Sequence, residues 1–321
     1  MRYRFVLFAV IFILIIAFLI YTESTLYNED IKIGTSYWLG YGFLYYLQDA
    51  KILDKNFEVI EFNSTSEVLR AYRNRLINSL CLTTDEVLRN YTENDPYTIL
   101  IVLSVSEGAD LIIARKDIKE PSALKGKRIG LENTALGRYM FKRFLEINKF
   151  DERDFFLVYV EPHEHYKSFA EGDIDAVITY EPIASRIISA LGGNIIFSSK
   201  QIPGEVYDFV LVRRDFLLKN KKKIKDMINH YFEIIDEFKI SNSDMYDKYL
   251  SENYKISMEK LHDIFNFDKI KFFDKKENRE LLLKGELEQK LRLIEKYFSL
   301  KEPVDYSKLI DIKILNELYR E

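Results

Sequence analysis

Residues 173–182 read Asp173-Ile174-Asp175-Ala176-Val177-Ile178-Thr179-Tyr180-Glu181-Pro182. The segment Ala176–Thr179 is apolar and rich in β-branched residues, which predicts a short buried strand, and Pro182 ends that strand. In α/β domains, ligand-binding groups lie just beyond the carboxyl ends of buried strands. This stretch therefore predicts an α/β fold in which Tyr180 and Glu181 face a small molecule.

The same strand and helix alternation extends over residues 31–213. The strands expected are Ile31–Gly34, Phe57–Phe62, Leu80–Thr83, Thr98–Ser104, Gly108–Ala114, Lys127–Leu131, Phe155–Val160, Ala176–Thr179, Ile195–Ser198 and Phe209–Arg213. The helices expected between them include Ala135–Asn148, His165–Glu171 and Ile183–Leu191. The alternation predicts βαβ units and largely parallel sheets.

From Asp215 onward the pattern becomes mostly helical and charged. The helices expected there are Phe216–Phe238, Met245–Tyr254, Met258–Phe265 and Glu277–Tyr297. The chain has 321 residues, enough for about two domains, and 47% of them are hydrophobic, enough for a sizeable core. The net charge of −4 argues against a nucleic-acid partner, because phosphate binding needs a concentrated basic surface.

The amino terminus predicts a membrane anchor. Arg2 and Arg4 precede an apolar run that begins at Phe5 and extends to Thr22. The run is long for a signal-peptide core and lacks a clear cleavage site, so an uncleaved transmembrane helix over residues 1–22 is favoured over a cleaved signal. The positive-inside rule exports everything after Thr22, with residues 23–30 as a short tether.

Three loops at the carboxyl ends of predicted strands carry candidate ligand-binding residues. Tyr37 and Trp38 precede two glycines, and a loop tryptophan there can form a stacking wall for a flat or cationic ligand. The alternative is a ring packed under its own loop. Asn133 and Thr134 stand at the start of the Ala135–Asn148 helix, where free backbone N–H groups hold anions or carbonyl oxygens, or where these side chains simply cap the helix.

Glu181 carries the third loop's carboxylate. It can accept a hydrogen bond from a ligand N–H or ammonium group, or it can cap the helix that begins at Ile183. Asp85 follows the strand that contains Cys81. Asp110 lies between two predicted strands, where the chain is expected to cross from one domain to the other. Both are further candidates for ligand contact.

Signals for catalysis and metal binding are missing from the sequence. His163 and His165 are two positions apart and would share a face only on a strand, whereas Pro162 favours a loop, and no third ligand has suitable spacing nearby. The single cysteine, Cys81, excludes an internal disulfide and a cysteine-based metal site, and its apolar neighbours predict a small buried side chain. No catalytic motif or dinucleotide fingerprint is present, so we expect no enzyme, no cofactor and no metal.

Several segments in this order and spacing resemble periplasmic substrate-binding proteins of ABC importers. They are Ile31–Gly42, Gly108–Ala114, Leu124–Glu132, Gly172–Pro182 and Gln201–Glu205. The likeness is to the nitrate/sulfonate/taurine and thiamine-precursor group and covers about residues 30–215. It implies the periplasmic-binding-protein type 2 fold, with two α/β lobes that close by a hinge motion on a ligand between them.

The resemblance also implies a domain division and a set of cleft residues. Residues 31–106 with 205–321 would form lobe 1, including the helical C-terminal segment, and residues 107–204 would form lobe 2. The expected cleft residues are Tyr37, Trp38, Asn133, Thr134, Tyr180 and Glu181, with Asp85 and Asp110 carried over less directly.

The resulting expectation is a solute-binding protein at the periplasmic face of the bacterial inner membrane, anchored by Phe5–Thr22, that delivers a small polar ligand to an ABC permease. A nitrogen heterocycle such as a thiamine-precursor pyrimidine is favoured over nitrate or a sulfonate, because these loops hold no arginine or lysine. One alternative is a ligand-sensing subunit that signals through a membrane partner. Another is an enzyme of pyrimidine-precursor synthesis on the same fold, which would need a reactive histidine or a metal in the cleft.

Overall fold

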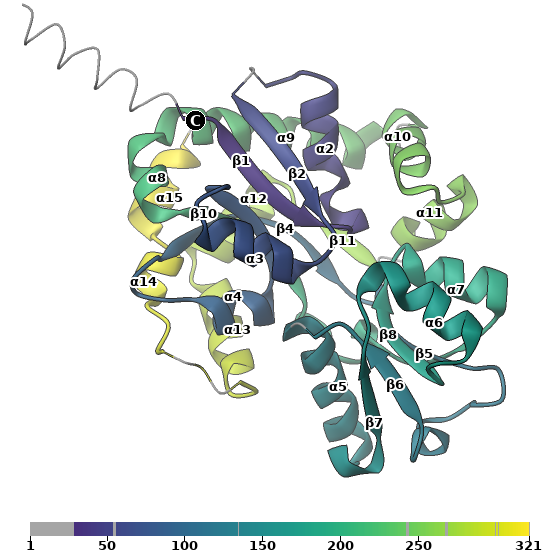
Figure 1. Cartoon of the computed structure of the whole chain (residues 1–321). Coiled ribbons are helices and arrows are strands. Elements are labelled where there is room, and N and C mark those ends of the chain that lie inside the picture. Colours follow the sequence, from purple (N-terminus) through teal and green to yellow (C-terminus); the bar gives the residue numbers. More distant parts are fainter. Residues whose placement is uncertain are drawn as a thin grey trace, which may run out of the picture.

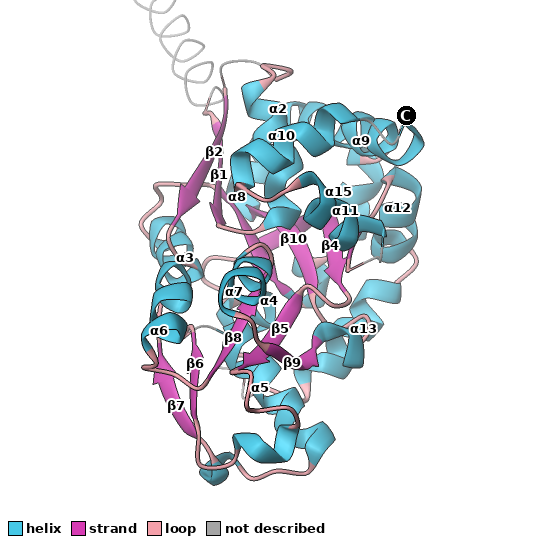
Figure 2. Cartoon of the chain, turned by 90° about the vertical axis from the view of Figure 1, so that its right-hand side faces the viewer, coloured by secondary structure: helices cyan, strands magenta, loops and turns pink. Residues whose placement is uncertain are grey.

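The computed structural model describes residues 29–53, 56–133, 135–241, 244–266, 269–298, 300 and 302–320. Within these residues, the strands form a six-stranded sheet in the order β11-β4-β10-β3-β1-β2 and a five-stranded sheet in the order β7-β6-β8-β5-β9. Each sheet has helices packed on it, and the two views show two bodies side by side (Figures 1 and 2). We call the body built on the six-stranded sheet lobe 1 and the other lobe 2.

The strands of the two sheets alternate with helices up to β10. The strands are β1 Ile31–Ser36, β2 Phe57–Phe62, β3 Ser79–Thr83, β4 Tyr97–Ser106, β5 Asp110–Ala114, β6 Arg128–Leu131, β7 Phe156–Tyr159, β8 Ala176–Tyr180, β9 Asn194–Ser198, β10 Tyr207–Arg213 and β11 Ile270–Phe272. The α-helices up to β10 are α2 Gly42–Asp49, α3 Thr65–Arg73, α4 Thr84–Asn90, α5 Ala135–Asn148, α6 His165–Glu171 and α7 Ile183–Leu191. Short 3-10 helices lie at η1 Leu39–Tyr41, η2 Pro121–Leu124, η3 Glu152–Asp154, η4 Pro162–Glu164 and η5 Ser199–Gln201.

After β10 the chain is mostly helical, as expected, and these helices cover lobe 1. They are α8 Arg214–Lys219, α9 Lys221–Ser241, α10 Asp244–Tyr254, α11 Met258–Asn266, α12 Lys275–Leu283, α13 Glu286–Glu295, α14 Tyr306–Leu309 and α15 Ile312–Leu318. Two of the expected helices are each divided in two. The first breaks at Asn220, whose side chain bonds back to the Phe216 carbonyl, and the second breaks at Gly285, which has φ of +79°.

The expectation of largely parallel sheets was wrong, because both sheets are mixed. β1 pairs parallel with β2 and β3, and β6 pairs parallel with β7 and β8. The strands that lead from one lobe to the other pair antiparallel: β10 with β3 and β4, and β5 with β8 and β9. Each of these two strands therefore runs against both of its neighbours and interrupts the parallel βαβ pattern of its sheet.

The strand β11 was also missed by the sequence reading. It spans Ile270–Phe272, between helices α11 and α12, and pairs antiparallel with the carboxyl end of lobe 1's long strand β4 at Ser104–Ser106. A three-residue strand of this kind carries almost no periodicity, so its partner decides that it forms.

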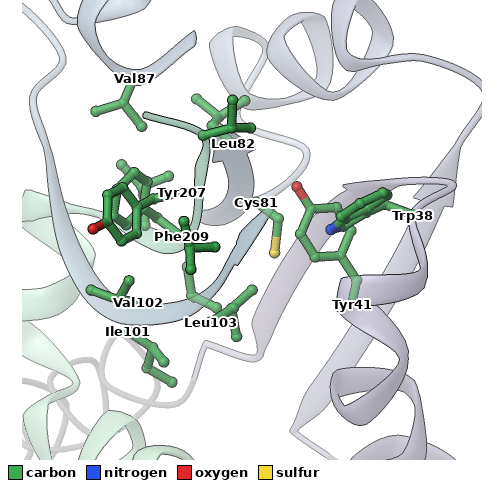
Figure 3. Packing of buried hydrophobic residues seen from close by; sticks show 14 of the residues in the cluster. Trp38, Tyr41, Cys81, Leu82, Val87, Ile101, Val102, Leu103, Tyr207 and Phe209 are labelled. Atoms are coloured by element: carbon green, nitrogen blue, oxygen red, sulfur yellow. The ribbon is translucent and has the colours of Figure 1, made fainter. Parts of the chain in front are cut away.

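Local signals located several elements without error. The bounds of β2, α5, α6 and α7 are those expected from the sequence. Ser64 caps α3 by accepting a hydrogen bond from the Glu67 backbone N–H, as its position predicts. Cys81 is buried within the apolar core of lobe 1, as expected (Figure 3).

The expected anchor, Phe5–Thr22, and residues 23–28 of the tether lie outside the described residues. Within the described ranges, none of the helices combines the length and the apolarity that crossing a membrane requires.

Candidate functional site

A cavity with about 590 Å³ of empty space, part of it open to solvent, lies between the two lobes. Lobe 1 lines it with Ser36, Trp38, Tyr41, Thr65, Thr83, Glu86 and Asp208. Lobe 2 lines it with Asp110, Glu132, Leu136, Gly137, Met140, His165, Ile178, Thr179 and Tyr180. These residues stand at strand ends and in the first turns of helices, where side chains project beyond a sheet edge.

Antiparallel pairing brings the first residues of β5 and β10 to this edge. Asp208 lies opposite Thr83 at the carboxyl end of β3, and Asp110 lies opposite Tyr180 at the carboxyl end of β8. The amino ends of the crossing strands therefore meet the carboxyl ends of the parallel ones. Carboxylates carried by both kinds of strand end face the same cavity.

Asp208 organises the lobe 1 wall. Its Oδ2 accepts hydrogen bonds from Trp38 Nε1 at 3.1 Å and Ser104 Oγ at 2.8 Å, and its Oδ1 accepts one from the Tyr41 hydroxyl at 3.2 Å. Burial raises the pKa of Asp208 to about 7, the Asp110 charge adds to this, and these donors oppose it. The carboxylate thus fixes two aromatic rings of the wall, those of Trp38 and Tyr41, which are labelled in Figure 3.

Trp38 and Tyr180 form an aromatic contact across the cavity. Their ring centroids are 5.7 Å apart with an interplanar angle of 85°, and the Tyr254 hydroxyl donates to the Trp38 carbonyl at 2.9 Å. Gly40 allows this indole position, because a Cβ there would stand 2.2 Å from Trp38 Nε1. The two rings come from different lobes, so their contact requires the lobes to be close together.

Further carboxyl groups give the cavity an acidic character. Glu86 belongs to a capping box, in which its Oε2 accepts a hydrogen bond from the Thr83 N–H at 3.1 Å. Burial and the neighbouring charge of Asp85 raise the pKa of Glu86, and burial raises the pKa of Asp110 to about 7. Glu132 lines the cavity as well, whereas no lysine or arginine stands among the described lining residues.

His165 lies in the lobe 2 wall with both ring nitrogens engaged. Its Nδ1 is 3.1 Å from Thr179 Oγ1 and its Nε2 is 3.1 Å from the Val160 carbonyl oxygen. Burial lowers the pKa of His165 to about 4, so the ring is neutral. This residue therefore lies in the cavity wall with both of its ring nitrogens engaged by protein groups.

Three of the residues expected from the sequence line the cavity: Trp38, Asp110 and Tyr180. Tyr37 lies outside the lining set, with its hydroxyl donating to the Tyr254 carbonyl at 3.1 Å. Asp85 is buried beside the cavity, where its Oδ1 accepts a hydrogen bond from Thr83 Oγ1 at 2.7 Å.

The other expected residues lie elsewhere. Asn133 is exposed and does not line the cavity, and Thr134 lies outside the described residues. Glu181 is buried with its carboxylate on Ser185, accepting from the backbone N–H and from Oγ at 3.0 Å each. The Glu181 side chain therefore accepts hydrogen bonds from the first turn of α7, while Pro182 holds the N-cap position; this is the capping role that was the alternative to ligand contact.

Several cavity residues were not foreseen, and the reasons differ. Glu86 belongs to the candidate stretch Thr83–Glu86, from which only Asp85 was selected, although Thr83-x-x-Glu86 is a capping box at the carboxyl end of a strand. Asp208 lies near the amino end of the antiparallel strand β10, whereas the candidates were taken from the carboxyl ends of strands. His165 was considered only as half of a metal pair with His163, which is exposed.

Metal ligation finds no support in the residues that the structure describes. They contain no group of three or more His, Cys, Asp or Glu side chains placed to hold an ion. The neutral, fully bonded His165 agrees with a structural or recognition role for that side chain.

Comparison with known proteins supports the resemblance seen in the sequence. A sequence model described as the NMT1-like family matches residues 29–241. No curated protein sequence matches this chain. The alkanesulfonate-binding protein SsuA from Xanthomonas axonopodis pv. citri, bound to MOPS, matches with a TM-score of 0.65 at 15% identity, covering 83% of this chain and 94% of that one.

Two further solved structures have the same fold. The ligand-binding component of an ABC-type import system from Staphylococcus aureus, with zinc bound, gives a TM-score of 0.73 at 15% identity, covering 91% of this chain and 100% of that one. The periplasmic nitrate-binding protein NrtA from Synechocystis PCC 6803 gives 0.63 at 14% identity, covering 90% and 88%. The α/β two-lobed architecture is thus that of periplasmic binding proteins, and the match over residues 29–241 shows that this chain belongs to the NMT1-like family.

Proposed function

We propose that this chain is the solute-binding subunit of an ABC importer and that its ligand is a small nitrogen-containing organic molecule, with a nitrogen heterocycle favoured over nitrate or a sulfonate. One observation carries the proposal. The interlobe cavity is walled by Trp38 and Tyr180 and holds the carboxyl groups of Glu86, Asp110 and Glu132, with no cationic side chain among its described lining residues.

The chemistry of these groups selects the ligand class. Aromatic faces attract flat rings and cations, and carboxylates accept hydrogen bonds from N–H groups. A nitrate or sulfonate ion would meet like charge in this cavity and lose its hydration without a compensating partner. Trp38 and Tyr180 wall the ligand, and Asp110 accepts a hydrogen bond from it. Tyr37, Asp85, Asn133 and Glu181 do not line the cavity and are not carried into the proposal.

The family membership and the fold support the transport role. SsuA and NrtA are named for sulfonate and nitrate binding in the periplasm; this chain has their architecture, and its own cavity is acidic. We extend the proposal to location and partner: Phe5–Thr22 holds the protein at the periplasmic face of the inner membrane, and the closed, loaded form docks on an ABC permease.

Isothermal titration of the full chain with 4-aminopyrimidine, taurine and nitrate tests the ligand class. We expect binding of the pyrimidine alone, and a loss of roughly tenfold or more in affinity on Asp110→Asn, because one charge-assisted acceptor is removed. The matched control is Asp226→Asn, which changes an exposed carboxylate and should leave the affinity unchanged. Tight binding of taurine or nitrate that Asp110→Asn does not weaken would refute the proposal.

A further inference from the structure

The ring of His165 can adopt only one protonation state in its surroundings. Its Nε2 lies 3.1 Å from the Val160 carbonyl oxygen, which can only accept a hydrogen bond. Nε2 must therefore carry a proton, since the other tautomer would set a lone pair against a carbonyl oxygen. The ring is also buried, which opposes a second proton. Nδ1 is consequently a bare acceptor.

This state determines the direction of the next hydrogen bond. Nδ1 lies 3.1 Å from Thr179 Oγ1, and a bare nitrogen can only accept. The Thr179 hydroxyl must therefore donate its single proton to His165. Because Thr179 also lines the cavity, its hydroxyl has only lone pairs left to offer a ligand.

Two other hydroxyl groups of the cavity wall also donate their protons to acceptors inside the protein. The Tyr41 hydroxyl donates to Asp208 Oδ1 at 3.2 Å, and Thr83 Oγ1 donates to Asp85 Oδ1 at 2.7 Å. Each of these protons is used inside the protein. The wall therefore presents oxygen acceptors where the residue types alone would allow donors as well.

We infer that His165 is a positioning residue that holds Thr179 as a hydrogen-bond acceptor toward the cavity, and that this arrangement selects ligands with an N–H donor at that point over isosteres with a carbonyl oxygen there. The inference rests on the proposed function and sharpens it, because it names the hydrogen-bonding polarity that the ligand must have. His165 acts through Thr179 and needs no contact of its own with the ligand.

Nitrogen NMR of the full-length wild-type protein tests the tautomer directly. With ¹⁵N-labelled histidine, we expect His165 to show an unprotonated Nδ1 and a protonated Nε2, and its signal is identified by its loss in His165→Gln. A proton on Nδ1, or an imidazolium at neutral pH, would overturn the inference. This measurement needs no ligand and no destabilised variant.

Ligand selectivity tests the consequence. The probes are 4-aminopyrimidine and pyrimidin-4-one, which share a ring outline but exchange an amino donor for a carbonyl acceptor. We expect the wild type to favour the amino compound by roughly tenfold, since a donor left without a partner, or two facing acceptors, weakens binding by about that factor. In His165→Leu the Thr179 hydroxyl is free to turn its proton toward the cavity, and the ratio should approach one.

Two further variants separate positioning from folding. His165→Gln retains an N–H and a carbonyl oxygen on one side chain, so it should keep much of the wild-type ratio. In Thr179→Val the ratio should also collapse, and adding His165→Leu to it should change the ratio no further. If His165→Leu weakens both probes equally and leaves the ratio unchanged, His165 is purely structural and the inference fails.

The failure of the proposed function would look different. If neither pyrimidine binds the wild type, the proposed ligand class is wrong, and the nitrogen spectrum alone then decides the inference about His165.

Discussion

At the residue scale, the cavity concentrates acidic groups whose protonation the protein has changed. Burial raises the pKa of both Asp110 and Asp208 from 3.8 to about 7. The charges of Asp85 and Glu181 also raise the pKa of Asp110, the charge of Asp110 also raises that of Asp208, and Asp208 keeps three donors that favour its charged form. A ligand that brings N–H groups or a positive charge would restore the ionised state, so binding and protonation are coupled.

This coupling predicts opposite pH dependences for stability and for binding. Because the folded pKa values are raised, the stability that these carboxyls confer is fully present below pH 3.8 and is lost as the pH rises to about 7. The rise corresponds to at most roughly 4 kcal/mol for each group. We expect the free energy of unfolding of the ligand-free protein to fall between pH 5 and 8. In Asp110→Asn this fall should be smaller by about 2 kcal/mol.

Urea unfolding across this range measures the first effect, and titration with 4-aminopyrimidine measures the second. Binding should weaken as the pH falls below 7, since protonated carboxyls no longer attract the ligand. The assignment would be contradicted if the free energy of unfolding rose steadily between pH 5 and 8 and its pH dependence were the same in Asp110→Asn as in the wild type.

At the scale of single elements, helix α5 links the cavity to a contact between the lobes. Its first turns carry Leu136, Gly137 and Met140 into the cavity wall. Farther along, Arg143 makes a bidentate ion pair with Glu205, with Nε to Oε2 at 2.8 Å and Nη2 to Oε1 at 2.9 Å.

Other contacts join the middle of α5 to Glu205 and Tyr297. The Tyr139 hydroxyl also donates to Glu205, at 2.5 Å, and the Arg143 guanidinium lies 4.4 Å from the centroid of the Tyr297 ring. Lys142 Nζ donates to the Tyr297 carbonyl at 2.7 Å. One rigid helix therefore joins the ligand-facing surface of lobe 2 to the C-terminal part of lobe 1.

Glu205→Gln should weaken ligand binding even though Glu205 is not in the cavity. Loss of the paired charge weakens the contact that holds the lobes together by about 1 kcal/mol. This corresponds to about a fivefold rise in Kd. Titration calorimetry with 4-aminopyrimidine checks this. Asp151→Asn is the control, because it alters the exposed Asp151–Arg153 ion pair on lobe 2 and should leave Kd unchanged. An unaltered Kd in Glu205→Gln would show that α5 does not transmit this contact.

At the scale of the whole molecule, the two chain crossings between the lobes meet at Ser199. The Ser199 side chain is fully buried, and its Oγ accepts from the Gly108 N–H at 2.7 Å and lies 2.9 Å from Ser106 Oγ. The Ser106 N–H also donates to the Val206 carbonyl at 2.8 Å. The first crossing is therefore bonded to the second, and any hinge motion of the lobes turns on this junction.

Ser199→Ala should lower the free energy of unfolding by about 1–3 kcal/mol, because it leaves the Gly108 N–H buried without its acceptor. Urea denaturation gives the value. Ser122→Ala replaces an exposed serine in lobe 2 and should change it by less than about 0.5 kcal/mol. Equal effects of the two substitutions would mean that the junction contributes nothing to holding the lobes together.

Much of the fold could be predicted from local sequence. Helix α5 begins and ends where its apolar spacing indicates, and β8 and α7 are separated at Pro182 as expected. The breaks at Asn220 and Gly285 and the strand β11 were missed, because they depend on a side-chain bond, a single backbone angle and a distant partner strand.

The sequence by itself determined the family, the alternation of strands and helices, and the aromatic residues Trp38 and Tyr180 at strand ends. Only the tertiary structure decided which polar groups meet them. Asp208 reaches the cavity through antiparallel pairing with β3, and Glu181 turns to the α7 cap because the Ser185 N–H and hydroxyl lie within hydrogen-bond distance. The physical reason is that strand ends and helix caps are local features, whereas the direction of a crossing strand and the proton on His165 depend on groups far apart in the chain.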